Sequence, residues 1–217
     1  MKPWERLLRR FGRGRAFEAD VVIVSGLPRS GTSMMMKMLE AGGIPPLTDR
    51  QRTADEDNPK GYYEFERVKQ LKDSDVAWLP EARGKAVKVI SALLEHLPAE
   101  YNYRVLFMRR ALPEILASQR QMLIRRGEDP DKTSDEEMAI LYEKHLRKVE
   151  AWLEGQPNFE VLYLDYNRLL ERPGPDIARI NAFLGDVLDT EKVNSVIDPD
   201  LYRQRQAREA DGQEYAG

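Results

Sequence analysis

The sequence contains no cysteine and only two histidines, and these scarcities exclude several kinds of chemistry. Without cysteine the chain has no disulfide, no thiolate metal site and no cysteine nucleophile. The two histidines, His96 and His145, lie far apart in the sequence and do not show the spacing of a histidine-based metal centre. We therefore predict an activity that uses no bound metal.

Long apolar runs are also missing. No stretch approaches the roughly 20 apolar residues that cross a bilayer, and the N-terminus lacks the continuous apolar core of a signal peptide. These absences predict a cytoplasmic protein with no transmembrane segment. The amphipathic stretch 4–11, which has arginines around it, fits an interfacial membrane helix. We favour the other interpretation, a short docked helix or a disordered arm.

A surplus of basic charge is absent too, because 34 Lys and Arg residues face 37 Asp and Glu residues and give a net charge of −3. This balance argues against a nucleic-acid partner. The 217 residues suffice for one sizeable core and contain no internal repeat or long linker. We predict one domain over 1–217, with residues 1–18 as an N-terminal arm and residues 203–217 as a polar tail.

Four apolar runs, at 21–24, 86–90, 105–108 and 161–164, predict strands. Most are continuous rather than alternating, as expected of parallel strands that are covered on both faces. The predicted helices cover 34–41, 113–126, a long stretch after a capping box at Ser134 and Glu137, and a stretch after Pro173-Gly174-Pro175. This alternation predicts an α/β domain with three layers, in which helices flank a central parallel sheet of about four to five strands.

The segment 25–33 joins the first predicted strand directly to a helix. Gly26 and Gly31 permit backbone conformations that other residues resist, so successive N–H groups can converge on an anion at the helix N-terminus. The same segment carries hydroxyls and a guanidinium, on Arg29, Ser30, Thr32 and Ser33. A plain glycine turn needs none of these groups, so the combination indicates a phosphate-binding loop.

The loop nearly matches the nucleotide-triphosphatase pattern G-x-x-x-x-G-K-[ST], but Thr32 occupies the lysine position. That lysine normally reaches the β- and γ-phosphates. Its absence disfavours an ATP- or GTP-dependent kinase, which stays the second hypothesis.

A second candidate for phosphate binding is Arg110, at the end of a strand, with Ser118 eight residues later in the following helix. Carboxyl ends of parallel strands line the ligand crevice, so the two side chains could close on one phosphate. Arg109 is a rival for this role. Alternatively, Arg110 and Ser118 simply face solvent.

Together, these motifs resemble those of the sulfotransferase family, which has a P-loop-like fold and uses the donor PAPS (3′-phosphoadenosine-5′-phosphosulfate). The family loop reads Pro-[Lys/Arg]-Ser-Gly-Thr-[Thr/Ser], and residues 28–33 read Pro-Arg-Ser-Gly-Thr-Ser, similar to tyrosylprotein sulfotransferases and many bacterial relatives. The resemblance, which covers roughly 21–184, implies that Arg29 through Ser33 bind the phosphosulfate. It also implies that Arg110 and Ser118 bind the 3′-phosphate, although proline follows Arg110 by three residues rather than two.

Weaker similarities concern Lys88 and Tyr166. A lysine in an apolar strand is costly to bury unless it reaches water or an anion. The resemblance implies that Lys88 contacts the leaving phosphate, and that Tyr166 contacts adenine unless it merely packs at the strand end. Cytosolic members carry a catalytic histidine where this chain has Ile90, so another base is needed.

The best candidate for this base is Glu64, because tyrosylprotein and heparan-type members draw a glutamate from the region after their first helix. Alternatively, Glu64 begins a surface helix with Phe65, Val68 and Leu71. The reserve candidates are His96, followed by Asp49, Glu56 and Asp57.

The resulting prediction is a sulfotransferase that moves a sulfuryl group from PAPS to a hydroxyl or amine and releases PAP, with Arg29, Lys88 and Glu64 as catalytic residues. The acceptor, a small molecule, carbohydrate, lipid or peptide, stays unidentified. Its pocket is expected in the loops 44–60 and 126–135. Besides the kinase, a non-catalytic phosphonucleotide-binding module is an alternative.

Overall fold

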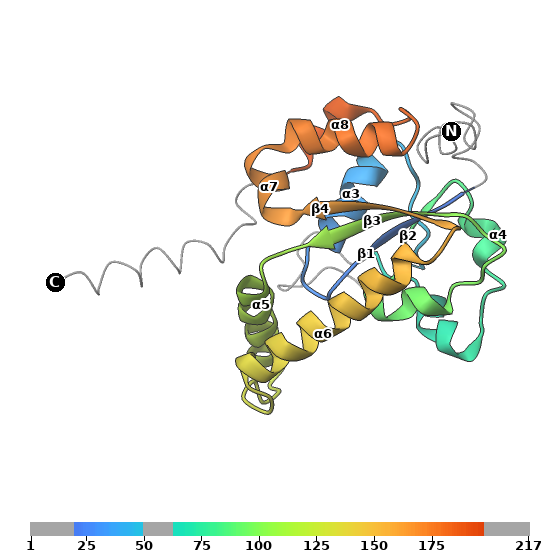
Figure 1. The fold of residues 1–217 in the computed structure, drawn as a ribbon. Helices are drawn as coiled ribbons and strands as arrows, with labels where there is room; N and C mark the ends of the chain where they lie inside the picture. The colour runs from blue at the N-terminus through green and yellow to red at the C-terminus, as the bar shows by residue number, and fades with distance from the viewer. Residues whose placement is uncertain (1–19, 50–62, 198–217) are drawn as a thin grey trace.

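The computed structural model describes residues 20–49 and 63–197, and its centre is a four-stranded sheet (Figure 1). The strands are β1 (Val21–Gly26), β2 (Ala86–Lys88), β3 (Tyr103–Arg109) and β4 (Phe159–Asp165). They lie in the order β2-β1-β3-β4, and every pairing is parallel. The predicted α/β class with a central parallel sheet is therefore confirmed. The predicted arm 1–18 and tail 203–217 lie outside the described residues.

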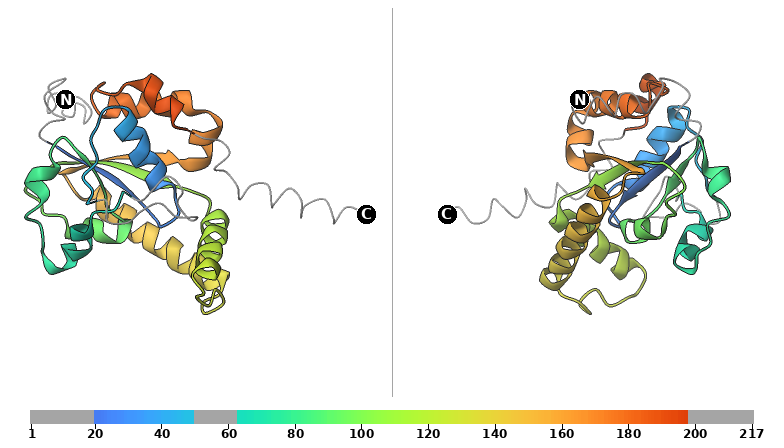
Figure 2. Two further views of the ribbon diagram at one scale, coloured as in Figure 1. Left: turned by 180° about the vertical axis from the view of Figure 1, so that it is seen from behind. Right: turned by 45° about the vertical axis from the view of Figure 1, so that its right-hand side comes forward.

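Helices cover both faces of the sheet, as Figures 1 and 2 show. One face carries α3 (Thr32–Ala41), α7 (Tyr166–Glu171), α8 (Pro173–Phe183) and α9 (Thr190–Ser195). The other carries the 3-10 helices η1 (Glu66–Asp73) and η2 (Ser91–His96), with α4 (Leu79–Ala82) and α6 (Asp135–Glu154). Finally, α5 (Leu112–Arg125) projects beyond the carboxyl edge of the sheet.

The continuous apolar run of β1 follows from this three-layer arrangement. Val21 and Ile23 pack into the core on one face, whereas Val22 and Val24 pack into the core on the other. All four side chains are fully buried. Successive side chains of a strand point to opposite faces, so a strand covered on both sides needs apolar residues at every position.

The strand register brings several carboxyl ends to one edge. Gly26 of β1 lies beside Met108 of β3, and Arg109 of β3 lies beside Asp165 of β4. The segments that follow these strands therefore meet at this edge, as expected for the ligand-binding edge of a parallel sheet. The strand predicted at 86–90 is shorter than expected, because the chain turns into η2 directly after Ile90.

The capping box of α6 is confirmed, since the backbone N–H of Glu137 donates to Ser134 Oγ over 3.2 Å and the Glu137 side chain accepts in return. The first half of α6 is largely exposed. Leu141 is 55% exposed because the start of α6 lies beside α5, beyond the sheet, and only Val149 and Leu153 are buried. A further correction concerns α8, which begins at Pro173 itself, since proline suits the first turn of a helix.

A histidine links α6 to η2, and its burial predicts a pH-dependent stability. His145 Nε2 lies 2.8 Å from Ser91 Oγ, and burial lowers the pKa of His145 below its ordinary value of 6.5, with the charge of Lys148 acting in the same direction. Because protonation is harder in the folded chain, this contribution to stability is complete above the ordinary value and lost as pH falls through the lowered one.

We therefore expect the free energy of unfolding, measured with urea, to fall between pH 7.5 and pH 5, and His145→Gln to reduce this fall. The control is His96→Gln, which should keep it. Equal falls in the wild type and in His145→Gln would contradict the prediction.

Candidate active site

The loop between β1 and α3 is held in shape by its own backbone and side chains. Three of its residues have φ in the left-handed region: Gly26 at 144°, Arg29 at 68° and Gly31 at 98°. Ser30 is buried, and its Oγ donates to the carbonyl oxygen of Leu27 over 2.7 Å. Gly31 is the N-cap of α3, so the first N–H groups of that helix belong to the loop. The loop therefore has the form of a preformed anion-binding turn.

The two candidate phosphate sites contact one another through Arg29. Its Nε donates to Ser118 Oγ over 2.9 Å, and its carbonyl oxygen accepts from a terminal nitrogen of Arg110 over 3.1 Å. A non-glycine residue at φ 68° is uncommon and persists where its surroundings hold it, as these contacts do. Residues predicted separately, from segments far apart in the sequence, thus meet at one place.

Tyr166 packs tightly against the loop. A Cβ atom on Gly31 would lie 2.3 Å from Tyr166 Cδ2, so only glycine leaves room for the ring. The guanidinium carbon of Arg110 lies 4.6 Å from the ring centroid, and Tyr166 is 6% exposed. In this structure the ring supports the loop and Arg110, and its contact with adenine stays a prediction.

The crowding at Gly31 predicts a large loss of stability for Gly31→Ala. The substitution combines a left-handed φ with a clash against Tyr166, each of which costs about 1–3 kcal/mol. The matched control is Gly43→Ala, where φ is 102° but nothing lies within 4 Å of the new atom. Urea unfolding should show the larger loss for Gly31→Ala, and equal losses would mean that Tyr166 moves aside without cost.

The sequence leaves open whether Arg109 or Arg110 is the candidate for phosphate binding. The structure places Arg110 beside the loop. Arg109 instead donates to Glu150 Oε1 of α6 over 2.7 Å and lies over the Tyr163 ring, 4.0 Å from its centroid. Neighbouring residues at the end of a strand point to opposite faces, which explains why the two side chains diverge.

Two residues that the sequence analysis missed hold Arg110. Arg110 Nε donates to Glu114 Oε2 over 2.9 Å, and Asn167 Nδ2 donates to Glu114 Oε1 over 2.7 Å. The Arg110 and Glu114 side chains are only 8% and 11% exposed. The spacing of four residues around a helix start could have indicated Glu114, whereas the sequence contains no signal for Asn167.

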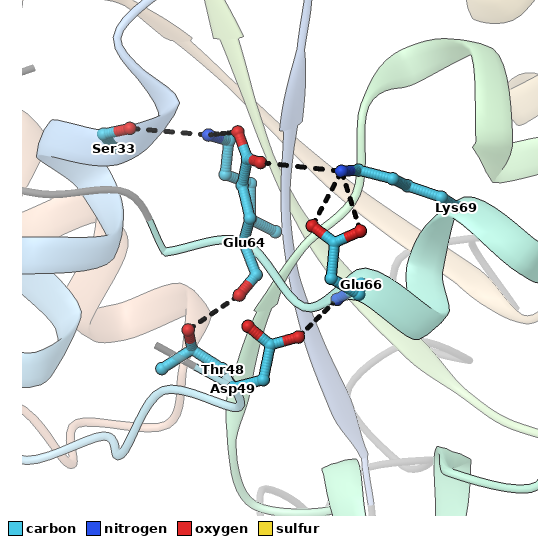
Figure 3. A network of polar contacts seen from close by, with 7 residues as sticks. Ser33, Thr48, Asp49, Glu64, Glu66 and Lys69 are labelled. Atoms are coloured by element: carbon cyan, nitrogen blue, oxygen red, sulfur yellow. Dashed lines mark hydrogen bonds and ion pairs between the residues drawn. The ribbon is translucent and has the colours of Figure 1, made fainter. Parts of the chain in front are cut away.

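Glu64 and Ser33, both labelled in Figure 3, form the third part of the site together with Lys88. Lys88 Nζ lies 3.4 Å from Ser33 Oγ at the start of α3 and 3.8 Å from Glu64 Oε1. The Lys88 and Glu64 side chains are 13% and 24% exposed. Lys69 Nζ lies 4.0 Å from the other Glu64 oxygen, and Glu66 binds this lysine over 2.7 Å. The predicted lysine and the predicted base thus lie beside the phosphate loop.

Backbone contacts fix the segment that carries Glu64. Thr48 Oγ1 donates to the carbonyl oxygen of Glu64 over 2.7 Å, and the N–H of Glu66 donates to Asp49 Oδ2 over 2.7 Å. The surface helix predicted to begin at Glu64 is a 3-10 helix that begins at Glu66, and Val68 and Leu71 are buried. Of the reserve bases, Glu56 and Asp57 lie outside the described residues, Asp49 binds the Glu66 backbone, and His96 ends η2.

No three His, Asp or Glu side chains within 20–49 and 63–197 form a cluster that could hold a metal ion. No helix in the same ranges has the length and apolarity to cross a bilayer.

Comparisons with known proteins agree with the fold. Residues 19–211 match the family described as the sulfotransferase domain, whereas no curated protein matches the chain in sequence. The solved sulfotransferase STF1 from Mycobacterium tuberculosis is similar with a TM-score of 0.52 and 15% identity, over 82% of this chain and 70% of that one. At 15% identity, this similarity shows a shared fold and nothing more.

Two further structures have TM-scores of 0.45. Retinol dehydratase in complex with androsterone and the inactive cofactor PAP has 18% identity over 81% of this chain. A sulfotransferase domain from the curacin biosynthetic pathway has 13% identity, over 76% of this chain and 73% of that one. The chain spans only 62% of the length of retinol dehydratase.

Proposed function

Because the chain belongs to the sulfotransferase domain family, we propose that it transfers a sulfuryl group from PAPS to a hydroxyl or amine acceptor and releases PAP. One observation supports this proposal most: the loop residue Arg29 contacts both Ser118 and Arg110. A donor with a phosphosulfate at one end and a phosphate on its ribose needs two anion sites this close together. A nucleoside triphosphate would leave the second site unused.

The donor would bind with its 5′-phosphosulfate on the loop residues and its 3′-phosphate on Arg110 and Ser118. The loop residues concerned are Arg29, Ser30, Gly31, Thr32 and Ser33. In the structure the Arg29 guanidinium and the Ser118 hydroxyl bind one another, so phosphate oxygens would replace that hydrogen bond with charge-assisted ones.

Sulfuryl transfer resembles phosphoryl transfer, so positioning and charge stabilisation supply most of the catalysis. Arg29 and Lys88 would stabilise the negative charge that develops on the leaving phosphate oxygen. Glu64 would accept the proton of the attacking hydroxyl or amine. The distance of 3.8 Å between Lys88 Nζ and Glu64 Oε1 supports this division, because a base at Glu64 would then act close to the proposed leaving-group lysine.

Ligand-dependent thermal stability tests the donor assignment. A ligand at 100-fold above its Kd stabilises the folded chain by about 2.7 kcal/mol. We expect PAP to raise the Tm, and ATP and GTP to leave it unchanged. Transfer of labelled sulfate from PAPS to a panel of phenols, sugars, lipids and peptides then separates an enzyme from a binding module. Stabilisation by ATP without stabilisation by PAP would favour a kinase.

A further inference from the structure

Arg110 is held by three different parts of the chain. Its Nε donates to Glu114 Oε2 of α5, a terminal nitrogen donates to the Arg29 carbonyl of the loop, and its guanidinium lies over the Tyr166 ring of α7. A guanidinium has five N–H donors, and within the described residues these contacts use two of them. The side chain is thus fixed in one orientation and keeps donors for a ligand.

Glu114 is fixed as firmly as the arginine that it binds. One carboxylate oxygen accepts from Arg110 over 2.9 Å, and the other accepts from Asn167 Nδ2 over 2.7 Å. Asn167 directly follows Tyr166, so two neighbouring residues of α7 hold the two members of the ion pair. Rotation of the carboxylate would break at least one of these hydrogen bonds.

A buried carboxylate beside an anion-binding arginine has two opposite effects. Its negative charge lowers the positive potential that a phosphate would meet, which weakens binding. Its hydrogen bond removes rotamer freedom from a long side chain before the ligand arrives, which strengthens binding. Each oxygen of Glu114 accepts from a different partner, and the side chain is 11% exposed, so the carboxylate is held in one orientation. This rigidity favours the second effect.

We propose that Glu114, held by Asn167, is a positioning residue that orients Arg110 for the 3′-phosphate and thereby sets the preference for nucleotides that carry this group. The proposal rests on the donor site described under Proposed function. Glu114 itself does not touch the nucleotide, and its effect is exerted through the orientation of Arg110.

The measurement is the ratio of two dissociation constants, that of AMP divided by that of PAP, from isothermal titration calorimetry. The two probes differ only in the 3′-phosphate, so the ratio isolates the contribution of Arg110 and Ser118. We expect Glu114→Ala to lower the ratio about tenfold through weaker PAP binding, the effect of one well-made hydrogen-bonded contact. A purely electrostatic role predicts the opposite, because removal of the carboxylate would tighten PAP binding.

A second buried ion pair provides the matched control. Arg104 Nε donates to Asp20 Oδ2 over 2.8 Å near the amino ends of β1 and β3, with side chains 8% and 4% exposed. Asp20→Ala should therefore lower the Tm as Glu114→Ala does but keep the ratio within about twofold. This comparison separates positioning from a merely structural role.

The outcomes are distinguishable. An unchanged or increased ratio in Glu114→Ala overturns the positioning role. A wild type that binds AMP as tightly as PAP overturns the donor site, and the positioning role with it. If Glu114→Ala does not fold, Asn167→Ala keeps the ion pair and removes only the amide. We expect this variant to lower the ratio about threefold, within the range that one hydrogen bond contributes, and an unchanged ratio again overturns the proposal.

Discussion

Replacing Glu64 with glutamine is expected to lower the rate of sulfuryl transfer about 10²- to 10⁴-fold, the range for loss of a general base. Glutamine keeps the size and hydrogen-bonding shape of the side chain but cannot accept a proton. The Glu64 carboxylate lies 3.8 Å from Lys88, which itself lies 3.4 Å from Ser33 of the loop, so the proposed base lies beside the proposed phosphosulfate site. The rate is measured by transfer of labelled sulfate to the acceptor identified in the screen.

The control for Glu64→Gln is Glu66→Gln. Glu66 lies two residues away, carries the same functional group and binds the same Lys69, but its side chain is 42% exposed. We expect the Glu66 variant to keep the wild-type rate within about twofold, since exposed ion pairs contribute little. Binding of PAP should survive in both variants. A wild-type rate in Glu64→Gln would remove Glu64 from the mechanism and make His96 the next candidate.

The second large effect is expected for Lys88→Met, which should lower the transfer rate about 10²- to 10³-fold, as loss of one group that stabilises developing charge does. Methionine nearly matches the lysine stem in length and apolar packing, and it removes the charge and the N–H donors. The Lys88 side chain is 13% exposed, and charges act more strongly where water is excluded. Because the effect lies in the transition state, kcat should fall much more than PAP affinity.

Lys69→Met is the matched control for Lys88→Met. Lys69 also lies near the Glu64 carboxylate, at 4.0 Å, but its side chain is 57% exposed. We expect its loss to change the rate by no more than about threefold. A rate loss as large as that of Lys88→Met would show that Lys69 is needed as much as Lys88 and would contradict the prediction. The double variant of Glu64 and Lys88 should lose less than the product of the two single losses, as residues that act together do.

Local sequence predicted β1, the loop and α3 well because each of these elements is determined by residues close together in the chain. The run at 21–24 is apolar at every position, since Val21 and Val22 belong to different cores. The glycine at position 31 is required both by its φ of 98° and by the Tyr166 ring. Only the first of these reasons is local, and the partner of Gly31 could not be predicted from the loop itself.

The parts of the site that depend on distant contacts could not be read from the sequence. Arg109 and Arg110 are adjacent and chemically equal, and only the position of α6 and the loop decides between them. Likewise, Thr48 and Asp49 determine where Glu64 lies, through hydrogen bonds to backbone groups that have no sequence signature. Leu141 is exposed because the sheet does not extend beneath the start of α6. The helical periodicity of a sequence carries no information about how far a sheet extends.

The contact between Arg110 and the carbonyl oxygen of Arg29 has a consequence for how this loop can vary during evolution. A carbonyl oxygen belongs to the main chain, so this half of the link does not depend on which side chain occupies position 29. Lysine there would keep a cation and the main-chain acceptor while losing only the forked donor. The hydrogen bond from Arg110 would therefore survive an exchange of arginine for lysine at position 29. Such an exchange can change the affinity for the donor while the loop stays aligned with Arg110.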